Sequence, residues 1–425
     1  MVGREIHKFA EQLWPINRSI TGSGLRETLR LIQNKIPSLA IHSIKSGSKA
    51  FDWKVPREWK VKSAYIIRPD GQKICDFSSN NLHLLNYSAP FRGELTLEEL
   101  KPNLYTLPEQ PDAIPYVTSY YQERWGFCLT HREYSSLTDG VYKIVVDTEL
   151  FDGEMNYGEL FIPGKSQKEI LLSSYVCHPS MANNELSGPT VLTYIAKFIN
   201  DLRHREYSYR IIFIPETIGS IVYLSRNYKY LKENVIAGFN LSCLGDDRAY
   251  SYLQSRDGDT ISDKVAKHVL KWIDPDFMEY DWLGRGGDER QFCAPGIDLP
   301  IASIMRTKYA EYPEYHTSLD DLKNVVTPAG LEGGFRAVQK CILTIEHNKL
   351  YQTTTLCEPN LGKRGMYPTI STQTNDKNVR KLLDLISLCD GKTYLLSIAE
   401  KMGVEMLDLC SMVDALKEQD LISEV

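Results

Sequence analysis

The sequence predicts an α/β fold in which a mostly parallel sheet is sandwiched by helices, with a small β-rich inserted domain and a C-terminal winged helix-turn-helix domain. Three observations predict this fold. Apolar, strand-like runs alternate with helical patterns between about residues 169 and 350. A stretch rich in Trp, Tyr and Pro, residues 46–116, interrupts the helical start, and residues 376–425 carry three further helical patterns. Buried strands that alternate with helices are typical of a parallel sheet covered on both faces.

Length and composition set limits on the class of protein. The chain has 425 residues, more than one small core accommodates, so two or three domains are expected. The net charge of -6 gives no reason to expect nucleic acid or an anionic membrane surface as a partner. The nine cysteines are scattered without a Cys-x-x-Cys pair, and the start lacks an apolar signal core, which favours a cytoplasmic protein. No apolar run approaches the roughly 18 residues of a membrane span.

The chain begins with two helical patterns, at residues 3–14 and 23–36, and Ser23 is a suitable N-cap for the second. The segment 18–22 between them is either a plain turn or a loop that reaches the active site. A hairpin turn at Asp70-Gly71 is typical of the inserted β-rich segment. The predicted domains are residues 1–45 and 117–350 for the α/β domain, 46–116 for the insertion, 351–375 for a linker and 376–425 for the winged helix.

The α/β region is predicted from its alternating pattern. Its strands are residues 169–176, 208–214, 235–244 and 299–305. Its helices are residues 189–202, 220–231, 260–273 and 328–349. The strands are apolar along most of their length, which indicates burial on both faces of the sheet.

The C-terminal segment has the pattern of a helix, a turn at Gly403, a second helix and a strand-like end, which is typical of a winged helix-turn-helix. Residues 376–425 contain six Lys and Arg against ten Asp and Glu. A surface that binds duplex DNA needs clustered positive charge. We therefore expect a packing or protein-contact role for this domain, and DNA binding is the less favoured alternative.

Polar side chains follow the ends of the predicted strands, where ligand sites form in open α/β sheets. These residues are His178, Glu216, Asp246, Asp288 and His316. Two histidines with carboxylates suit Zn²⁺, and a carboxylate that is not a ligand can serve as general base. Asp320 follows His316 by four residues and is expected to hold that imidazole in one tautomer.

The order of these motifs resembles that of a known family. The motifs are His178, Asn184-Glu-Leu-Ser-Gly188, Pro215-Glu216, Asn240-Leu-x-x-x-Gly245, Gly287-Asp288-x-x-x-Phe292 and Tyr315-His316-Thr317-x-x-Asp320. Across about residues 165–349 this pattern resembles the zinc aminopeptidases of the bacterial leucyl-aminopeptidase and glutaminyl-cyclase type. The whole chain looks like a bacterial aminopeptidase-like family whose members are often tied to polysaccharide biosynthesis. The resemblance implies that His178 and His316 bind metal, that Glu216 is the general base, and that Asp288 lies near the catalytic centre.

Several positions depart from the family pattern, because they lack the acidic ligand that the family has there. They are Ser180, Asn184, Thr217 and Ser242. Neutral side chains compensate the charge of two dications poorly. Three alternatives follow: one metal ion with extra ligands drawn from Glu216, Glu185, Asp246 or Asp288; a redrawn two-metal site; or an inert binding pocket.

The favoured interpretation is a metal-dependent hydrolase of aminopeptidase type that cleaves an amide or peptide bond. Its metal would be Zn²⁺, one ion or two, with His178, His316, Asn184 and Asp246 as candidate ligands. Glu216 and Asp288 are the candidate catalytic residues. The substrate would be a small peptide or another amide, and the chain could form a homo-oligomer. The alternative is a catalytically inert binding or scaffold protein that uses the winged helix for protein contacts.

Overall fold

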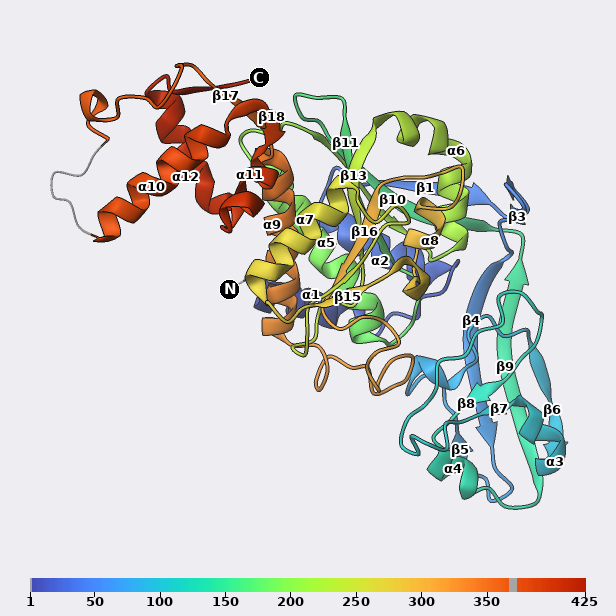
Figure 1. The fold of residues 1–425 in the computed structure, drawn as a ribbon. Helices are drawn as coiled ribbons and strands as arrows, with labels where there is room; N and C mark the ends of the chain where they lie inside the picture. The colour runs from blue at the N-terminus through green and yellow to red at the C-terminus, as the bar shows by residue number, and fades with distance from the viewer. Residues whose placement is uncertain (1, 367–372) are drawn as a thin grey trace. The chain divides into compact units, whose positions relative to one another are not determined.

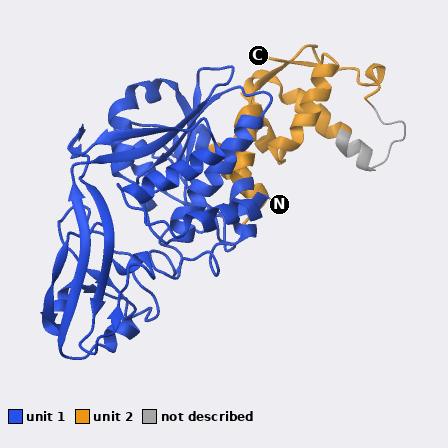
Figure 2. Ribbon diagram, turned by 180° about the vertical axis from the view of Figure 1, so that it is seen from behind, with its two compact units in different colours: residues 1–263, 277–336 blue, residues 264–276, 337–425 orange. Residues whose placement is uncertain are grey.

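The structure is a computed structural model that describes residues 2–366 and 373–425 (Figure 1). It divides into two compact units (Figure 2). The first contains residues 1–263 and 277–336, and the second contains residues 264–276 and 337–425. The first unit holds a large mixed sheet with helices and the inserted β-rich segment, and the second holds the C-terminal helices. The predicted fold class is therefore confirmed.

The main sheet has eight strands in the order β1-β10-β12-β11-β13-β16-β14-β15. The strands are β1 (Ala40–Lys45), β10 (Glu154–Ile162), β11 (Glu169–Tyr175), β12 (Ser208–Ile214), β13 (Val235–Leu241), β14 (Ser251–Leu253), β15 (Met278–Tyr280) and β16 (Ile301–Met305). The central strands β12, β11, β13 and β16 run parallel, while β10 and β14 are antiparallel to their central neighbours. Every residue of β11 and β16 is buried, as expected for strands covered on both faces.

Helices flank the main sheet on both faces (Figure 1). Within the first unit they are α1 (Val2–Leu13), α2 (Ser23–Lys35), α5 (Ser187–Asp201), α6 (Ile218–Asn234) and α8 (Glu289–Phe292). Two further helices, α7 (Ile261–Ile273) and α9 (Pro328–His347), have residues in both units. Helix α5 packs against β11 and β13. A Cβ atom at Gly188 would lie 2.4 Å from Ser174 Oγ and 2.5 Å from the carbonyl oxygen of Leu241. Glycine at this position therefore lets the start of α5 lie directly on the ends of these two strands.

The inserted segment forms a second sheet in the order β5-β4-β9-β6. Its strands are β4 (Glu58–Ile67), β5 (Lys73–Ile74), β6 (Phe91–Thr96) and β9 (Val141–Phe151). The turn between β4 and β5 contains Gly71 at a φ of 86°, in agreement with the predicted hairpin. The predicted end at residue 116 was too early, because β9 pairs along its length with β4 and β6 rather than with the main sheet. Shorter elements complete the segment: β2 (Lys49–Ala50), β3 (Trp53–Lys54), β7 (Leu104–Tyr105), β8 (Phe127–Cys128), α3 (Leu97–Leu100) and α4 (His131–Ser135).

The second unit contains the predicted helix-turn-helix. Its elements are α10 (Gln373–Leu388), α11 (Leu395–Met402), α12 (Met406–Glu418), β17 (Leu350–Thr353), β18 (Asp390–Tyr394) and β19 (Ile422–Glu424). Gly403 ends α11 with a φ of 64°, a conformation that glycine adopts without strain. The sheet order is β18-β17-β19, so the first residues of the predicted linker 351–375 form part of β17 instead. Residues 367–372 of that linker lie outside the described residues.

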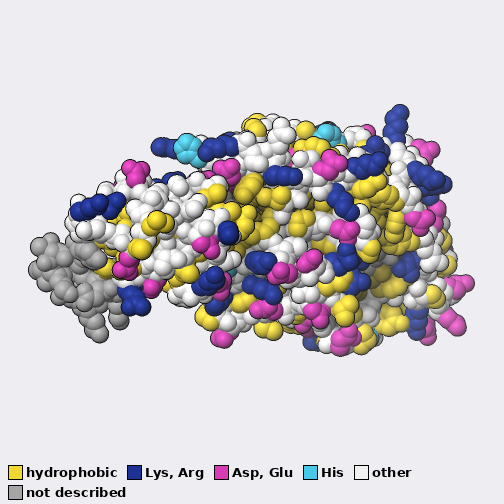
Figure 3. All heavy atoms as spheres, turned by 45° about the horizontal axis from the view of Figure 1, so that its top comes forward, with side chains coloured by type: hydrophobic (Ala, Val, Ile, Leu, Met, Phe, Trp, Pro, Cys, Tyr) yellow, Lys and Arg dark blue, Asp and Glu magenta, His cyan; other side chains and the backbone are white. Residues whose placement is uncertain are grey.

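The surface carries side chains of both charges (Figure 3), and the cysteines form no disulfide bonds. Figure 3 shows a face on which Lys and Arg side chains are interspersed with Asp and Glu. That face has no extended positive area of the kind that duplex binding needs. All nine cysteines are free, and seven of them are buried. None of the helices in the described ranges combines the length and apolarity that crossing a bilayer requires.

Candidate active site

The site is built where β11 ends. Cys177 and His178 follow this strand, and Ser180 then turns the chain at a φ of 43°. A short π-helical turn, η3 (Ala182–Leu186), leads directly into α5. Such turns are rare and are often found at functional sites. Every residue of η3 is buried, so its polar side chains must find partners inside the protein.

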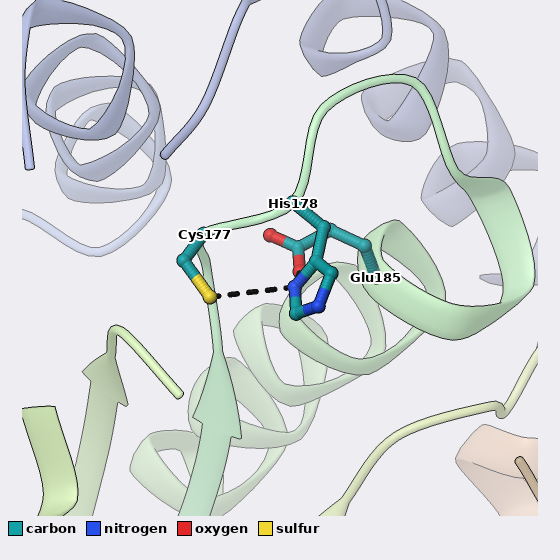
Figure 4. Close-up of side chains that lie close together, drawn as sticks. All are labelled: Cys177, His178 and Glu185. Carbon is teal, nitrogen blue, oxygen red and sulfur yellow. Dashed lines mark hydrogen bonds and ion pairs between the residues drawn. The ribbon is translucent and has the colours of Figure 1, made fainter. Parts of the chain in front are cut away.

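His178 is held on one side by a buried ionic chain. Its Nδ1 lies 2.9 Å from Glu185 Oε2, and 3.3 Å from the sulfur of Cys177 (Figure 4). Arg18 Nε lies 3.5 Å from Glu185 Oε1 and donates to the carbonyl oxygen of His178 at 3.0 Å. Arg18 also donates to the carbonyl oxygen of Leu13 at 2.6 Å and is completely buried. Of the two alternatives for residues 18–22, the structure thus favours a loop that reaches the site.

The other side of His178 faces Glu216 and His316. His178 Nε2 lies 3.6 Å from Glu216 Oε2. The His178 and His316 ring centres are 5.7 Å apart, although 138 positions separate the two residues in the sequence. Tyr116, from the stretch between β7 and β8 of the insertion, has its ring centre 5.1 Å from that of His178 and 5.2 Å from that of His316. The fold therefore brings three of the predicted site residues together.

The two histidines have opposite electrostatic surroundings. Burial lowers the pKa of His178, but the hydrogen bond and charge of Glu185 and the charge of Glu216 outweigh burial, and the pKa is raised. Burial and the neighbouring His178 lower the pKa of His316 to about 3. His316 is thus a neutral imidazole, the form that a metal ligand or a hydrogen-bond acceptor requires. Burial also raises the pKa of Glu216, and the charge of His178 opposes this effect.

A strained turn at Thr217 sets the orientation of the preceding residue, Glu216. Thr217 has a φ of 63° and a ψ of -76°, and the Ile218 N–H donates to the carbonyl oxygen of Glu216 at 2.8 Å. These values describe a γ-turn of the rare, strained form, which is unfavourable for a β-branched residue. Arg290 Nη2 donates to Thr217 Oγ1 at 2.6 Å and helps to hold the turn. Strain of this kind persists only where surrounding contacts impose it, and it clusters at functional sites.

Asp288 supports the same turn. Its Oδ1 accepts hydrogen bonds from the Thr217 N–H at 2.8 Å and from Ser220 Oγ at 2.7 Å. Its Oδ2 is buried and has no hydrogen-bond partner among the described residues. Burial, with the nearby charge of Glu216, raises the pKa of Asp288 to about 7. The structure therefore places Asp288 behind the Glu216 turn.

Asp320 holds η3 rather than His316. Its carboxylate accepts from the Asn183 N–H at 2.7 Å, the Asn184 N–H at 3.0 Å and the Tyr312 hydroxyl at 3.0 Å. Among the described residues it makes no hydrogen bond to the His316 ring, which differs from the prediction. The spacing of four residues would place the two side chains together only on a helix. Here the segment is a turn in which His316 has a φ of 55°.

Asn184 and Asp246 are engaged in structural hydrogen bonds. Asn184 Nδ2 donates to the Tyr175 hydroxyl at 2.9 Å, while its Oδ1 is buried without a partner among the described residues. Asp246 accepts from Asn183 Nδ2 at 2.9 Å, the Arg248 N–H at 2.9 Å, and both the N–H and the hydroxyl of Thr307 at 3.0 and 2.6 Å. Four donors occupy the Asp246 carboxylate, and Asp246 thus links the end of β13 to η3. Neither of its oxygens is free to bind a metal ion together with the histidines.

The donor atoms suit one metal ion better than two. In the described ranges, Cys177, His178 and Glu185 form the one group of three candidate ligands within 4.8 Å of one another. Glu185 already binds Nδ1 of His178, and the buried cation of Arg18 next to it opposes a metal ion there. On the Nε2 side, the 3.6 Å between His178 and Glu216 approaches the roughly 3.3 Å expected between two ligands of one tetrahedral zinc. A carboxylate on the far nitrogen of a ligating histidine is also the usual arrangement.

A cavity of about 210 Å³ adjoins Glu216 and His178. Its wall includes Trp53, Lys54 and Tyr121 from the insertion. The sequence analysis did not place these three residues in the site, although the richness of the insertion in Trp and Tyr was a signal, and it left open whether residues 18–22, which include Arg18, reach the site. Aromatic side chains at a cavity are common in ligand sites. The insertion therefore supplies part of the candidate active site.

Comparisons with known proteins agree with this architecture. Residues 7–348 match the family described as a domain of unknown function (DUF4910), and residues 349–424 match a winged helix-turn-helix family. A protein of Clostridium acetobutylicum named "Putative polysaccharide biosynthesis protein with aminopeptidase-like domain" is 44% identical over 425 residues, with 100% of this chain and 97% of that protein covered.

Solved structures show the same fold. A crystal structure described as a "putative peptidase" from Clostridium acetobutylicum has a TM-score of 0.94 at 43% identity and covers 100% of this chain and 97% of that one. A zinc aminopeptidase from Bacillus subtilis has a TM-score of 0.57 at 12% identity, over 81% of this chain and 94% of that one. An aminopeptidase from Aneurinibacillus sp. strain AM-1 has a TM-score of 0.52 at 13% identity, over 80% of this chain and 93% of that one. The chain therefore belongs to the DUF4910 family, has an aminopeptidase-like fold and carries a C-terminal winged helix-turn-helix domain.

Proposed function

We propose that this protein is a metal-dependent hydrolase that cleaves an amide or peptide bond. The observation that supports the proposal most is the meeting of His178, Glu216 and His316 beside a cavity, with the Nε2 atom of His178 facing the Glu216 carboxylate. One neutral imidazole and a second imidazole oriented by a carboxylate are donors that suit Zn²⁺, and a carboxylate beside them that does not bind the ion can serve as general base. His178 and His316 would hold the ion, with Glu216 facing the same space.

A bound zinc ion would polarise the amide carbonyl and make a water molecule more acidic. The protein's own groups would do the rest. Glu216 would take a proton from the attacking water and deliver it to the leaving amine, which a carboxylate with a raised pKa does well. Asp288 would keep the Glu216 turn in place through the Thr217 N–H. Glu185 would hold His178 with Nε2 directed at the substrate side.

Metal content and turnover test the proposal together. Protein purified without chelator is expected to contain about one equivalent of zinc, and His178→Ala should lose it. His204→Ala is a matched control because His204 is exposed and lies outside the site. Glu216→Gln should abolish hydrolysis of aminoacyl-amide or amide-linked sugar substrates while the fold remains intact. Less than a tenth of an equivalent of metal, the same in wild type and His178→Ala, would reject the proposal.

A second candidate is an aminopeptidase-like protein that binds a ligand without turnover. Two observations favour it. Asn, Thr and Ser stand at positions 184, 217 and 242, where the resemblance implies acidic ligands. The buried cation of Arg18 lies next to Glu185, within the site. Turnover that depends on Glu216 would exclude this candidate.

A further inference from the structure

The cavity beside Glu216 has two cationic side chains in its lining. Its charged lining consists of Glu216, His178, Lys54 and Arg290. A free α-amino group is next to the scissile amide, so groups close to the reacting centre would bind it, and residues farther away would bind the rest of the ligand. Here the residues away from His178 and Glu216 are cations. The cavity therefore suits a ligand with a negative charge.

Arg290 has donor capacity that the protein does not use. Its Nη2 atom donates to Thr217 Oγ1 at 2.6 Å. Its Nε is buried and has no hydrogen-bond partner among the described residues. The charge of Arg290 acts on the Glu216 carboxylate in the same cavity, but none of the ion pairs in the described part of the chain includes Arg290. A guanidinium carries five N–H donors in a planar fork that matches carboxylate and phosphate oxygens. Arg290 therefore keeps hydrogen-bond donors that a ligand anion in the cavity could occupy.

Lys54 supplies a second cation to the lining of the same cavity. It ends β3 in the insertion, is exposed, and makes no ion pair with any described residue. Next to it, the rings of Trp53 and Tyr121 meet edge to face with centres 5.5 Å apart. Tyr121 is 74% exposed, a high value for a large aromatic side chain that lines a cavity. Two cations and an aromatic wall thus surround one space.

We propose that the ligand of this cavity carries a carboxylate or phosphate group that Arg290 and Lys54 bind, with the adjoining part of the ligand against Trp53 and Tyr121. The proposal rests on the proposed function, because it names the substrate class of the same site. That substrate is an amide with an anionic group beside Arg290 and Lys54, and not a peptide with its free amino terminus there. Arg290 would fix the orientation of the anion by paired hydrogen bonds, and Lys54 would add charge.

Calorimetric titration of the purified full-length chain with three small probes tests the proposal. The probes are glutarate, inorganic phosphate and the uncharged glutaramide. At least one anion is expected to bind more tightly than glutaramide, with an affinity that falls as salt is added. Glutarate alone would identify a carboxylate site and phosphate alone a phosphate site. If neither anion binds more tightly than glutaramide, the proposal is wrong.

Variants assign the binding to the two cations. Arg290→Gln should weaken the anion about tenfold or more, and Arg290→Lys should retain part of the affinity. Lys54→Gln should weaken it less, and because Lys54 is exposed this variant should fold even if Arg290→Gln does not. Lys143→Gln is the control, because Lys143 is also an exposed lysine and lies on β9, and this variant should bind as the wild type does. Unchanged affinity in both Lys54→Gln and Arg290→Lys would refute the assignment.

Glu216→Gln separates this proposal from the proposed function. It should abolish turnover, yet it removes a negative charge from the cavity and should leave anion binding equal or tighter. Anion binding that depends on Arg290, in a protein that hydrolyses no amide, would reject the hydrolase and keep the anion site. Hydrolysis without any preference for anionic amides would reject only the anion site.

Discussion

Replacing Arg18 by Met tests whether Arg18, Glu185 and His178 act as one buried unit. Arg18 Nε lies 3.5 Å from Glu185 Oε1, and neither side chain is exposed, so solvent screens the pair little. At this distance and an effective dielectric constant of about 20, the Coulomb attraction is about 5 kcal/mol. Without Arg18, Glu185 keeps the His178 imidazole at 2.9 Å as a partner. We therefore expect the free energy of unfolding to fall by about 3 kcal/mol, the lower end for a broken buried pair.

Urea unfolding followed by tryptophan fluorescence measures this loss. Combining Arg18→Met with Glu185→Gln should recover part of it, with a coupling energy of about 2 kcal/mol in a double-mutant cycle. Arg132→Met is the matched control, because Arg132 pairs with Asp112 on the surface, where both side chains are more than half exposed. That pair should contribute less than about 1 kcal/mol. A loss no larger than in the control, or an additive double mutant, would refute the reasoning.

Three further predictions concern the scaffold. Gly188→Ala should destabilise the protein by about 2 kcal/mol in the same urea experiment, because the new Cβ would lie 2.5 Å from the Leu241 carbonyl oxygen; an unchanged midpoint would contradict this. Asp320→Ala should remove the acceptor for two backbone N–H groups of η3, and hydrogen exchange should show both amides less protected, with no change in α12. Burial raises the pKa of Glu400, but His268 and a lysine outweigh burial, and the pKa is lowered. The pair of Glu400 and His268 should therefore stabilise the second unit at pH values above 4.5, the pKa of Glu400 in the unfolded chain. This stabilisation should be lost as the pH falls through the lower pKa of Glu400 in the folded protein. Glu400→Gln should flatten that pH dependence of unfolding, and an unaltered profile would count against the pair.

Much of the fold could be predicted because its periodicity is local. The four apolar strands and the helices that follow them were placed correctly to within a few residues, since buried parallel strands are apolar throughout. The boundary of the insertion could not be predicted in the same way. Strand β9 has the pattern of any half-buried strand, and only its pairing with β4 and β6 assigns it to the second sheet. Pairing is a long-range property that a local pattern does not carry.

For the candidate site, too, the sequence predicted which residues come together but not which hydrogen-bond partners they have. Placement at strand ends predicted that His178, Glu216 and His316 would meet, because the carboxyl ends of parallel strands lie at one edge of a sheet. Which partner each side chain has could not be predicted. Asp246 and Asp320 are acidic residues in the segments that follow two of these strands, yet backbone, hydroxyl and amide donors occupy their oxygens.

The sequence by itself determined the aminopeptidase-like fold, the winged helix and the types of residue at the centre of the site. Only the tertiary structure decided that Arg18 enters the site, that Glu185 rather than Asp320 orients a histidine, and that the insertion adds Lys54 and Trp53 to a cavity with Arg290. The physical reason is that burial and pairing depend on segments distant in sequence. A buried arginine and a surface arginine have the same local pattern, and packing alone separates them.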